Sequence, residues 1–71
     1  MQRLDCTSLK CPLPLLKLKV ALVELSVGDE IELLASDPIS SRDIPKFCEK
    51  SGHRLLETSD GPVFRFRIQK A

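Results

Sequence analysis

The sequence predicts one α+β domain, a two-layer sandwich in which two helices cover one face of a four-stranded mixed sheet. Three observations lead to this prediction. The elements follow the order strand, helix, strand, helix, strand, strand; the first helix has a long apolar stripe; and the last strand alternates strictly between apolar and polar residues. Because 71 residues bury only a small core, we expect residues 1–71 to form a single domain without a deep substrate cavity.

The first half of the chain predicts a strand, a helix and a second strand. Residues 2–5 form the opening strand, and a helix follows over 15–25. Pro12 and Pro14 stand at its start, where the missing N–H of proline leaves no hydrogen bond unmade. The helix is expected to bury a wide stripe made of Leu15, Leu16, Leu18, Val20, Leu22, Val23 and Leu25. Its solvated face is expected to carry Lys17, Ala21 and Glu24.

The second half predicts a strand, a helix and a hairpin. A strand over 30–36 precedes a helix over 41–51, which ends at Gly52. Candidate caps of this helix are Ser40, Ser41 and Asp43, and its inner face carries Ile44, Phe47 and Cys48. Strands over 53–58 and 63–69 flank a turn at Asp60-Gly61. The first two strands are expected to be parallel and the last two antiparallel.

Composition and charge exclude several classes of function. Eleven basic and ten acidic residues leave a net charge of +1, so we expect no direct nucleic-acid partner. The most apolar run, 20–23, is far too short to span a membrane, and the N-terminus lacks the apolar segment of a secretory signal. Three cysteines, an odd number, argue against a disulfide scaffold and favour free thiols in a reducing cytoplasm.

The segment Cys11-Pro12-Leu13-Pro14 is the candidate site. It places a cysteine directly before a helix that begins with proline, where unpaired backbone N–H groups and the helix dipole stabilise a thiolate. The dipole lowers a thiol pKa by roughly 0.2–1.5 units, and the neighbouring Lys10 adds to this effect if its ammonium points toward the sulfur. The alternative is that Cys11 is only a small apolar residue at the sheet edge.

The other candidate ligands and bases have simpler explanations. Cys6 is a resolving thiol for Cys11, a second carrier or a bystander, and its spacing is not the C-x-x-C of a dithiol. Cys48 is expected in the core, and His53 to be a structural histidine rather than a proton-transfer group. Together these four residues would make a Cys₃His zinc set, but their spacing is looser than that of short zinc domains. We therefore expect no metal and no cofactor.

The run from Leu4 to Pro14, LDCTSLKCPLP, resembles the L-D-x-x-G-L-x-C-P-x-P signature of TusA/SirA-like sulfur-carrier proteins. The resemblance continues through Gly28-Asp29, Asp37-Pro38, the 43–48 segment and the 51–53 segment to the last strand. It implies a fold like the C-terminal domain of translation initiation factor three. It also implies that Cys11 carries sulfane sulfur as a persulfide, loaded by a cysteine desulfurase or a rhodanese and passed to a cysteine of an acceptor protein. Family destinations include tRNA thiolation, molybdenum-cofactor maturation and sulfur oxidation.

One departure from the signature concerns the loop before the cysteine. Ser8 stands where the family has glycine, and a serine is strained if this position needs a positive φ. Asp5 and Asp43 match acidic family positions, but capping or loop hydrogen bonds explain both. A set of exposed basic residues either docks an acidic partner or is a solvated face: Lys10, Lys17, Lys19, Arg42 and Lys46.

Three hypotheses follow from the sequence. The first is a monomeric sulfur carrier, a sulfurtransferase-like protein rather than a multiple-turnover enzyme, in which Cys11 is the nucleophile and Pro12, Pro14 and Lys10 support it. The second is a thiol–disulfide switch between Cys6 and Cys11. The third is a regulatory interaction module in which the thiols are dispensable. The proline-framed cysteine and the full-length resemblance favour the first.

Overall fold

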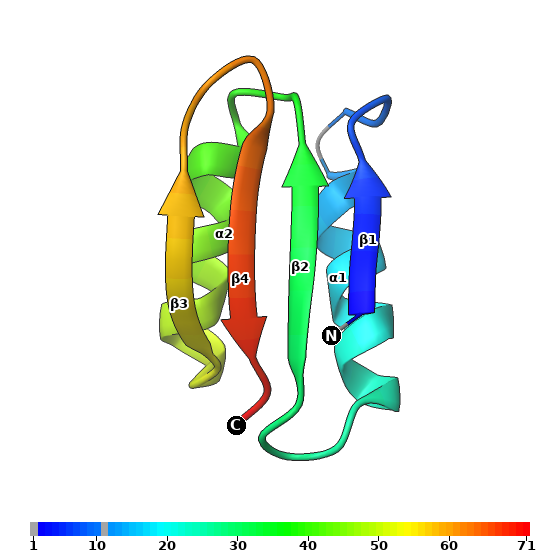
Figure 1. The fold of residues 1–71 in the computed structure, drawn as a ribbon, viewed down its shortest axis with the longest axis vertical. Coiled ribbons are helices and arrows are strands. Elements are labelled where there is room, and N and C mark those ends of the chain that lie inside the picture. Colours follow the sequence, from blue (N-terminus) through cyan, green and yellow to red (C-terminus); the bar gives the residue numbers. More distant parts are fainter. Residues whose placement is uncertain (1, 11) are drawn as a thin grey trace.

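The protein folds as four strands and two helices in the predicted order (Figure 1). The computed structural model describes residues 2–10 and 12–71. Its elements are β1 (Gln2–Cys6), α1 (Leu13–Glu24), β2 (Glu30–Ala35), α2 (Ser40–Ser51), β3 (Arg54–Ser59) and β4 (Phe64–Gln69). Where a strand begins or ends at a different residue from the one predicted, the difference is a single residue, which is the usual uncertainty of a boundary.

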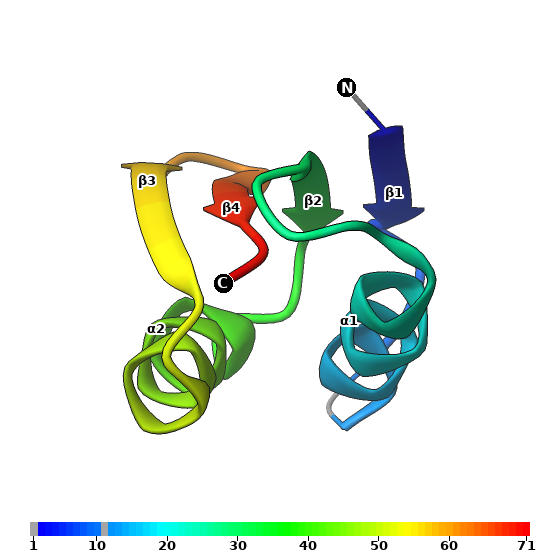
Figure 2. The same ribbon diagram turned by 90° about the horizontal axis from the view of Figure 1, so that it is seen from below.

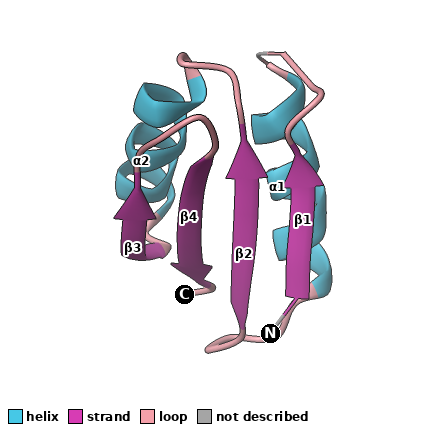
Figure 3. Ribbon diagram, turned by 45° about the horizontal axis from the view of Figure 1, so that its top comes forward, coloured by secondary structure: helices cyan, strands magenta, loops and turns pink. Residues whose placement is uncertain are grey.

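The four strands form one mixed sheet in the order β1-β2-β4-β3. β1 is parallel to β2, while β4 is antiparallel to both β2 and β3, which confirms the predicted parallel pair and hairpin. Seen along the sheet, both helices lie on the same side of it, with α1 near β1 and α2 near β3 and β4 (Figure 2). The predicted two-layer α+β architecture is therefore confirmed, and Figure 3 shows the helices together behind the sheet.

The core fills the space between the two layers. Alternating residues of β2 and β4 point toward the helices, and Leu33 pairs in register with Leu4 of β1 and Phe66 of β4. Both helices contribute buried side chains to this layer. The buried apolar cluster consists of Cys6, Leu18, Ala21, Leu22, Ile31, Leu33, Ile44, Cys48, Phe66 and Ile68.

The structure corrects the predicted orientation of α1. The helix begins at Leu13, two residues earlier than predicted, and ends at Glu24. Ala21, which we expected on the solvated face, is buried, and Pro14 is buried in the first turn. The residues expected to widen the buried stripe are instead exposed: Leu16, Val20 and Val23. Only one side of a helix can face the sheet, and the side with Leu18, Ala21 and Leu22 takes that place.

The structure also corrects the capping of α2. The N-cap position belongs to Ile39, which makes no side-chain capping hydrogen bond, and not to Ser40, Ser41 or Asp43. The carboxylate of Asp37 instead accepts a hydrogen bond from the Ile39 N–H at 2.9 Å, in the manner of an Asx turn. At the other end Gly52 adopts the left-handed conformation, with φ of 84°, and so terminates the helix as predicted.

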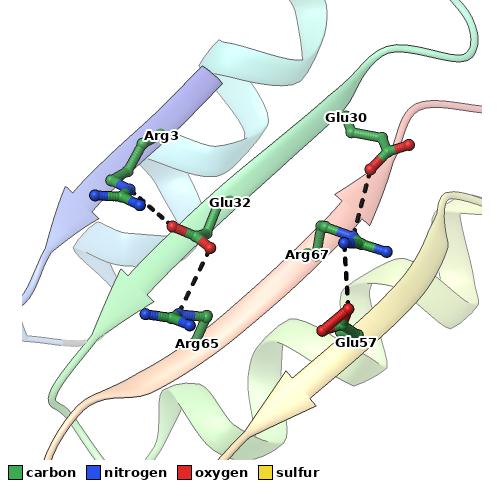
Figure 4. A network of polar contacts seen from close by, with 6 residues as sticks. All are labelled: Arg3, Glu30, Glu32, Glu57, Arg65 and Arg67. Atoms are coloured by element: carbon green, nitrogen blue, oxygen red, sulfur yellow. Dashed lines mark hydrogen bonds and ion pairs between the residues drawn. The ribbon is translucent and has the colours of Figure 1, made fainter. Parts of the chain in front are cut away.

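The sheet face opposite the helices carries ion pairs that link all four strands (Figure 4). Glu32 of β2 is only 8% exposed and lies between Arg3 of β1, at 2.7 Å, and Arg65 of β4, at 3.5 Å. Arg67 likewise contacts Glu30 at 3.4 Å and Glu57 at 3.2 Å. Charges that alternate across four strands are mutually attractive, so this face is stable in water without a third layer.

Among the residues that the structure describes, no helix is long and apolar enough to cross a membrane. Within the same residues, no cluster of three or more His, Cys, Asp or Glu side chains is arranged to hold a metal ion. The four candidate zinc ligands weighed above include Cys11, which lies outside the described residues.

Candidate functional site

The candidate site lies at one edge of the sheet, where both helices begin. β1 and β2 are parallel, so their carboxyl ends share this edge, and the connections to α1 and α2 leave from it side by side (Figure 3). Lys10 and Pro12, the sequence neighbours of Cys11, belong to the connection from β1 to α1. Cys11 itself lies outside the described residues, so its role stays a prediction.

A compact turn follows β1 and fixes the start of this connection. The Asp5 carboxylate accepts hydrogen bonds from the Thr7 N–H at 3.0 Å and the Thr7 hydroxyl at 2.7 Å. These two bonds hold the pKa of Asp5 below its usual value. The Ser36 hydroxyl, which follows β2, donates to the Thr7 carbonyl and ties the two connections together. The family-matched Asp5 therefore has a structural task in the loop.

Ser8 is not strained at the position where the family has glycine. Every described residue with a positive φ is a glycine, so Ser8 adopts an ordinary backbone conformation. The N–H of the next residue, Leu9, donates to the Cys6 carbonyl at 3.1 Å, which closes the turn. The substitution of serine for glycine is thus compatible with this loop.

The N-terminus of α1 has no side-chain cap. Pro12 occupies the N-cap without a side-chain hydrogen bond, and the first turn contains no acidic residue. The Leu13 N–H donates to the Lys10 carbonyl at 2.9 Å, which joins the connection to the helix. Pro14 is buried in the first turn, and its ring restricts the backbone at the start of the helix. A partial positive charge therefore remains at this end.

A shallow cleft of about 410 Å³ runs between the two connections and is open to solvent. It is lined by Thr7, Ser8, Leu9, Lys10, Ser36, Asp37 and Pro38. Its walls are mixed: some are short and polar, Leu9 and Pro38 are apolar, and Lys10 and Asp37 carry opposite charges. Because the cleft is open to solvent, a partner's side chain can reach it from outside.

The two described cysteines are buried, and burial disfavours the thiolate form of both. Cys6 is the last residue of β1 and has no exposed surface, and burial raises the pKa of its thiol. Burial also raises the pKa of Cys48, in α2, to about 11. Both thiols therefore stay protonated at neutral pH, and a protonated thiol is neither a nucleophile nor a metal ligand. These properties disfavour Cys6 as a resolving thiol and confirm the predicted core position of Cys48.

His53 has the structural surroundings that the sequence favours. Its Nδ1 accepts a hydrogen bond from the Ala71 N–H at 3.1 Å, and its ring lies 5.8 Å from the ring of Phe47. The imidazole thus joins the C-terminus of the chain to α2. His53 lies away from the cleft, on the side of the domain where α2 and the last residues of the chain meet.

The feature that sequence reasoning missed is the outward face of α1. The apolar residues of this helix form two stripes, one on each side, and we assigned both to the core. The spacing of three, four and three residues between Leu13, Leu16, Val20 and Val23 is the signal that separates the outer stripe from the inner one. The predicted basic residues are exposed as expected: Lys10, Lys17, Lys19, Arg42 and Lys46.

The fold and the proline-framed loop define a small two-layer α+β domain of the SirA-like class. The crystal structure of the SirA-like protein from Desulfitobacterium hafniense superposes on this chain with a TM-score of 0.84 at 29% identity, covering 97% of this chain and 96% of that one. The model of the sulfurtransferase TusA family matches residues 2–70. The chain belongs to the TusA family.

Two relatives indicate how close the similarity is. The sulfur carrier protein TusA of Pseudomonas entomophila is 47% identical over 68 residues, which cover 94% of this chain and 85% of the relative. The sulfur carrier protein TusA of Allochromatium vinosum is 38% identical over 71 residues, which cover 99% of this chain and 93% of the relative. Both similarities extend over nearly the whole domain.

Proposed function

We propose that this protein is a sulfur carrier that accepts sulfane sulfur as a persulfide on Cys11 and passes it to a thiol of an acceptor protein. The observation that carries the proposal is the uncapped, proline-framed start of α1, which follows Cys11 in the sequence. Membership of the TusA family supports the same role, since relatives of this family are named sulfur carriers.

Loading is a thiolate attack on a sulfane sulfur. The Cys11 thiolate attacks the terminal sulfur of a donor persulfide, R–S–SH; a new S–S bond forms at Cys11 while the donor S–S bond breaks. The donor leaves as the thiolate R–S⁻, and the sulfur atom with its proton becomes Cys11–S–SH. No external oxidant is needed, because the sulfane sulfur keeps its oxidation state. Delivery to the acceptor is the same exchange, with the acceptor thiolate as the attacking group.

The residues around Cys11 have supporting roles in this exchange. The positive end of α1 stabilises the thiolate, and Lys10 adds positive charge beside it. Pro12 and Pro14 restrict the backbone at the start of α1, and the first turn carries no acidic side chain that would repel the thiolate. The cleft is open, which suits a carrier that must meet both a donor and an acceptor protein. A free thiol requires a reducing compartment, as expected for the cytoplasm.

The donor that fits this chemistry is a protein that presents a persulfide, such as a cysteine desulfurase or a rhodanese. The thiol–disulfide switch is disfavoured because Cys6 is buried and protonated. A switch would have to expose the end of β1, which is paired along its length with β2.

The test is mass spectrometry of the purified protein after loading with a desulfurase and L-cysteine, or with a rhodanese and thiosulfate. We expect a mass gain of one sulfur atom that dithiothreitol removes and that peptide mapping assigns to Cys11. A loss of two hydrogens that links Cys6 to Cys11 would instead support the switch. No adduct from either donor, with the protein folded, would support the non-catalytic interaction module.

A further inference from the structure

The strands β1 and β2 end side by side, and the residues that follow them continue the contact. Cys6 of β1 pairs with Ala35 of β2 in the last step of the parallel ladder. The next residues are Thr7 and Ser36, and the Ser36 hydroxyl donates a hydrogen bond to the Thr7 carbonyl. A side chain thus takes over where backbone pairing stops, and it ties the β1–α1 connection to the β2–α2 connection (Figure 3).

Each residue of this tie is held by a turn of its own. The Asp5 carboxylate accepts hydrogen bonds from the Thr7 N–H at 3.0 Å and from the Thr7 hydroxyl at 2.7 Å, so Thr7 is fixed to β1. On the other side, Ser36 precedes Asp37, whose carboxylate accepts a hydrogen bond from the Ile39 N–H at 2.9 Å at the start of α2. Asp5, Thr7 and Ser36 therefore form a brace that joins β1 to the segment leading into α2.

The connection that the brace holds is the one that contains Cys11. Its far end belongs to α1: the Leu13 N–H donates to the Lys10 carbonyl at 2.9 Å, and the Leu16 N–H donates to the Pro12 carbonyl at 3.1 Å. That end is secured by backbone hydrogen bonds that run into the helix. The near end depends in addition on the side chains of the brace, so the change of a single side chain is enough to loosen it.

Sulfur transfer between two proteins depends on geometry more than the alkylation of a thiol does. In the proposed loading step the Cys11 thiolate attacks the terminal sulfur of a donor persulfide, R–S–SH; one S–S bond forms, the donor S–S bond breaks and R–S⁻ leaves. The attacking, central and leaving sulfur atoms must lie close to one line, and each protein holds its sulfur on a folded surface. A small reagent such as iodoacetamide turns freely to meet the thiolate, so its reaction needs no fixed connection.

We propose that the brace holds the β1–α1 connection in place for in-line sulfur transfer, and that Ser36, from the neighbouring connection, is a positioning residue for Cys11. The inference rests on the proposed function and adds which residues align its reacting thiol. The three residues of the brace act on the backbone of the connection through Thr7 and take no part in the exchange itself. Asp5 contributes as a hydrogen-bond acceptor and not as a charge, so an amide oxygen can replace its carboxylate.

The experiment measures single-turnover transfer of ³⁵S from a loaded donor, a cysteine desulfurase with labelled L-cysteine or a rhodanese with labelled thiosulfate. The carrier is varied in excess, which gives a limiting rate and a half-saturating concentration. Ser36→Ala and Asp5→Ala remove bonds of the brace, whereas Ser36→Thr keeps a hydroxyl and Asp5→Asn keeps an acceptor oxygen. The matched control is Asp29→Ala, which removes a carboxylate that accepts a hydrogen bond from the Ser26 N–H at 3.0 Å in the α1–β2 connection, at the opposite end of the domain (Figure 1).

We expect Ser36→Ala and Asp5→Ala to lower the limiting rate by about fivefold or more, because a misplaced thiolate attacks off line. Their half-saturating concentrations stay within about twofold of wild type, since binding of the donor is unchanged. Ser36→Thr, Asp5→Asn and Asp29→Ala keep the limiting rate within about twofold of wild type. Alkylation of Cys11 by iodoacetamide also stays within about twofold in every variant, because that reaction needs no alignment with a second protein.

Four results with a wild type that the donor loads would overturn the inference. The first is a wild-type limiting rate for either alanine variant of the brace. The second is a change confined to the half-saturating concentration, which would make the brace a docking contact. The third is an equal loss in Asp29→Ala or in the alkylation of Cys11, which would indicate a general loosening of the fold. The fourth is Asp5→Asn as slow as Asp5→Ala, which would assign the effect to charge. A wild type that neither donor loads would instead refute the proposed function, and the inference with it.

Discussion

The two helices lie side by side under the same sheet, yet their surfaces differ. α2 is amphipathic in the ordinary way: Ile44 and Cys48 face the core, and its outer face carries charged side chains such as Arg42 and Glu49. α1 buries Leu18 and Leu22 but exposes a second apolar stripe on the opposite side. The sheet needs only one apolar face from each helix, so the second stripe of α1 is not explained by folding.

The N-terminal ends of the two helices also differ. The start of α2 is closed by the Asp37 carboxylate, whereas the start of α1 has neither a side-chain cap nor an acidic residue in its first turn. The cysteines follow this division: Cys48 lies within α2 and is buried, and Cys11 precedes α1. The comparison teaches that α2 and its cysteine belong to the buried scaffold, whereas the start of α1 is where the proposed exchange of sulfur would take place.

The largest contrast that we predict is between the reactivities of the two cysteines. With the pKa of Cys48 at about 11, its thiolate fraction near neutral pH is roughly three hundredfold below that of an ordinary thiol of pKa ~8.5. We expect iodoacetamide at pH 7.5 to modify Cys11 first and to leave Cys48 and Cys6 almost unmodified until the protein is unfolded. Peptide mapping after timed alkylation measures the three rates. If Cys48 is modified as fast as Cys11 in the folded protein, the predicted difference between the cysteines of the two helices is wrong.

The next contrast is between the two sides of α1. Leu18→Ala removes a fully buried side chain and should lower the free energy of unfolding by about 2–5 kcal/mol. Val20→Ala, on the outer stripe, should change it by less than about 0.5 kcal/mol, since the side chain is exposed and alanine is a better helix former. Urea unfolding followed by circular dichroism measures both. Equal losses would mean that the outer stripe supports the fold as the inner one does.

The burial of Cys48 also predicts how stability depends on pH. Between pH ~8.5 and about 11 the unfolded chain releases the Cys48 proton while the folded chain keeps it. The unfolded state then binds fewer protons, so stability falls as pH rises, by up to about 1.4 kcal/mol per pH unit. Cys48→Ala should flatten this slope in urea titrations at pH 8.5, 9.5 and 10.5. If Cys48→Ala leaves the pH dependence of stability unchanged, a group other than Cys48 causes it.

The smallest effect concerns the C-terminal end of α2. Gly52→Ala should reduce the free energy of unfolding by about 1 kcal/mol. The added Cβ meets no atom within 4 Å, so the loss comes from the φ of 84° alone. Gly52→Asn, which tolerates this conformation better, should recover part of the loss in the same urea titration. An alanine variant as stable as wild type would show that the helix end relaxes without loss.

The element order, the parallel pairing of β1 with β2 and the β3–β4 hairpin follow from the sequence, helped by the strict alternation in β4 and the glycine that ends α2. The antiparallel pairing of β2 with β4, which sets the strand order, was not predicted. The rotation of α1 about its own axis does not follow from the sequence, because the helix carries leucine and valine on both sides. Either side could face the sheet, and only the structure shows that the side with Pro14 and Ala21 packs inward. The cap of α2 was missed because the capping carboxylate, Asp37, stands two residues before the N-cap. For the site, the sequence predicts the cysteine, its prolines and the start of a helix, but the hydrogen bonds of Asp5, Thr7 and Ser36 that shape the loop are visible only in three dimensions.

The most direct test of the central claim is single-turnover transfer of ³⁵S from a loaded donor to two complementary variants. One retains Cys11 as its sole cysteine, Cys6→Ala/Cys48→Ala, and the other, Cys11→Ser, lacks only that residue. Alanine keeps the two buried positions apolar, and circular dichroism checks that both variants fold. We predict that the first variant takes up label as wild type does and releases it to dithiothreitol, while the second takes up none. Dithiothreitol-sensitive label on folded Cys11→Ser would contradict the account.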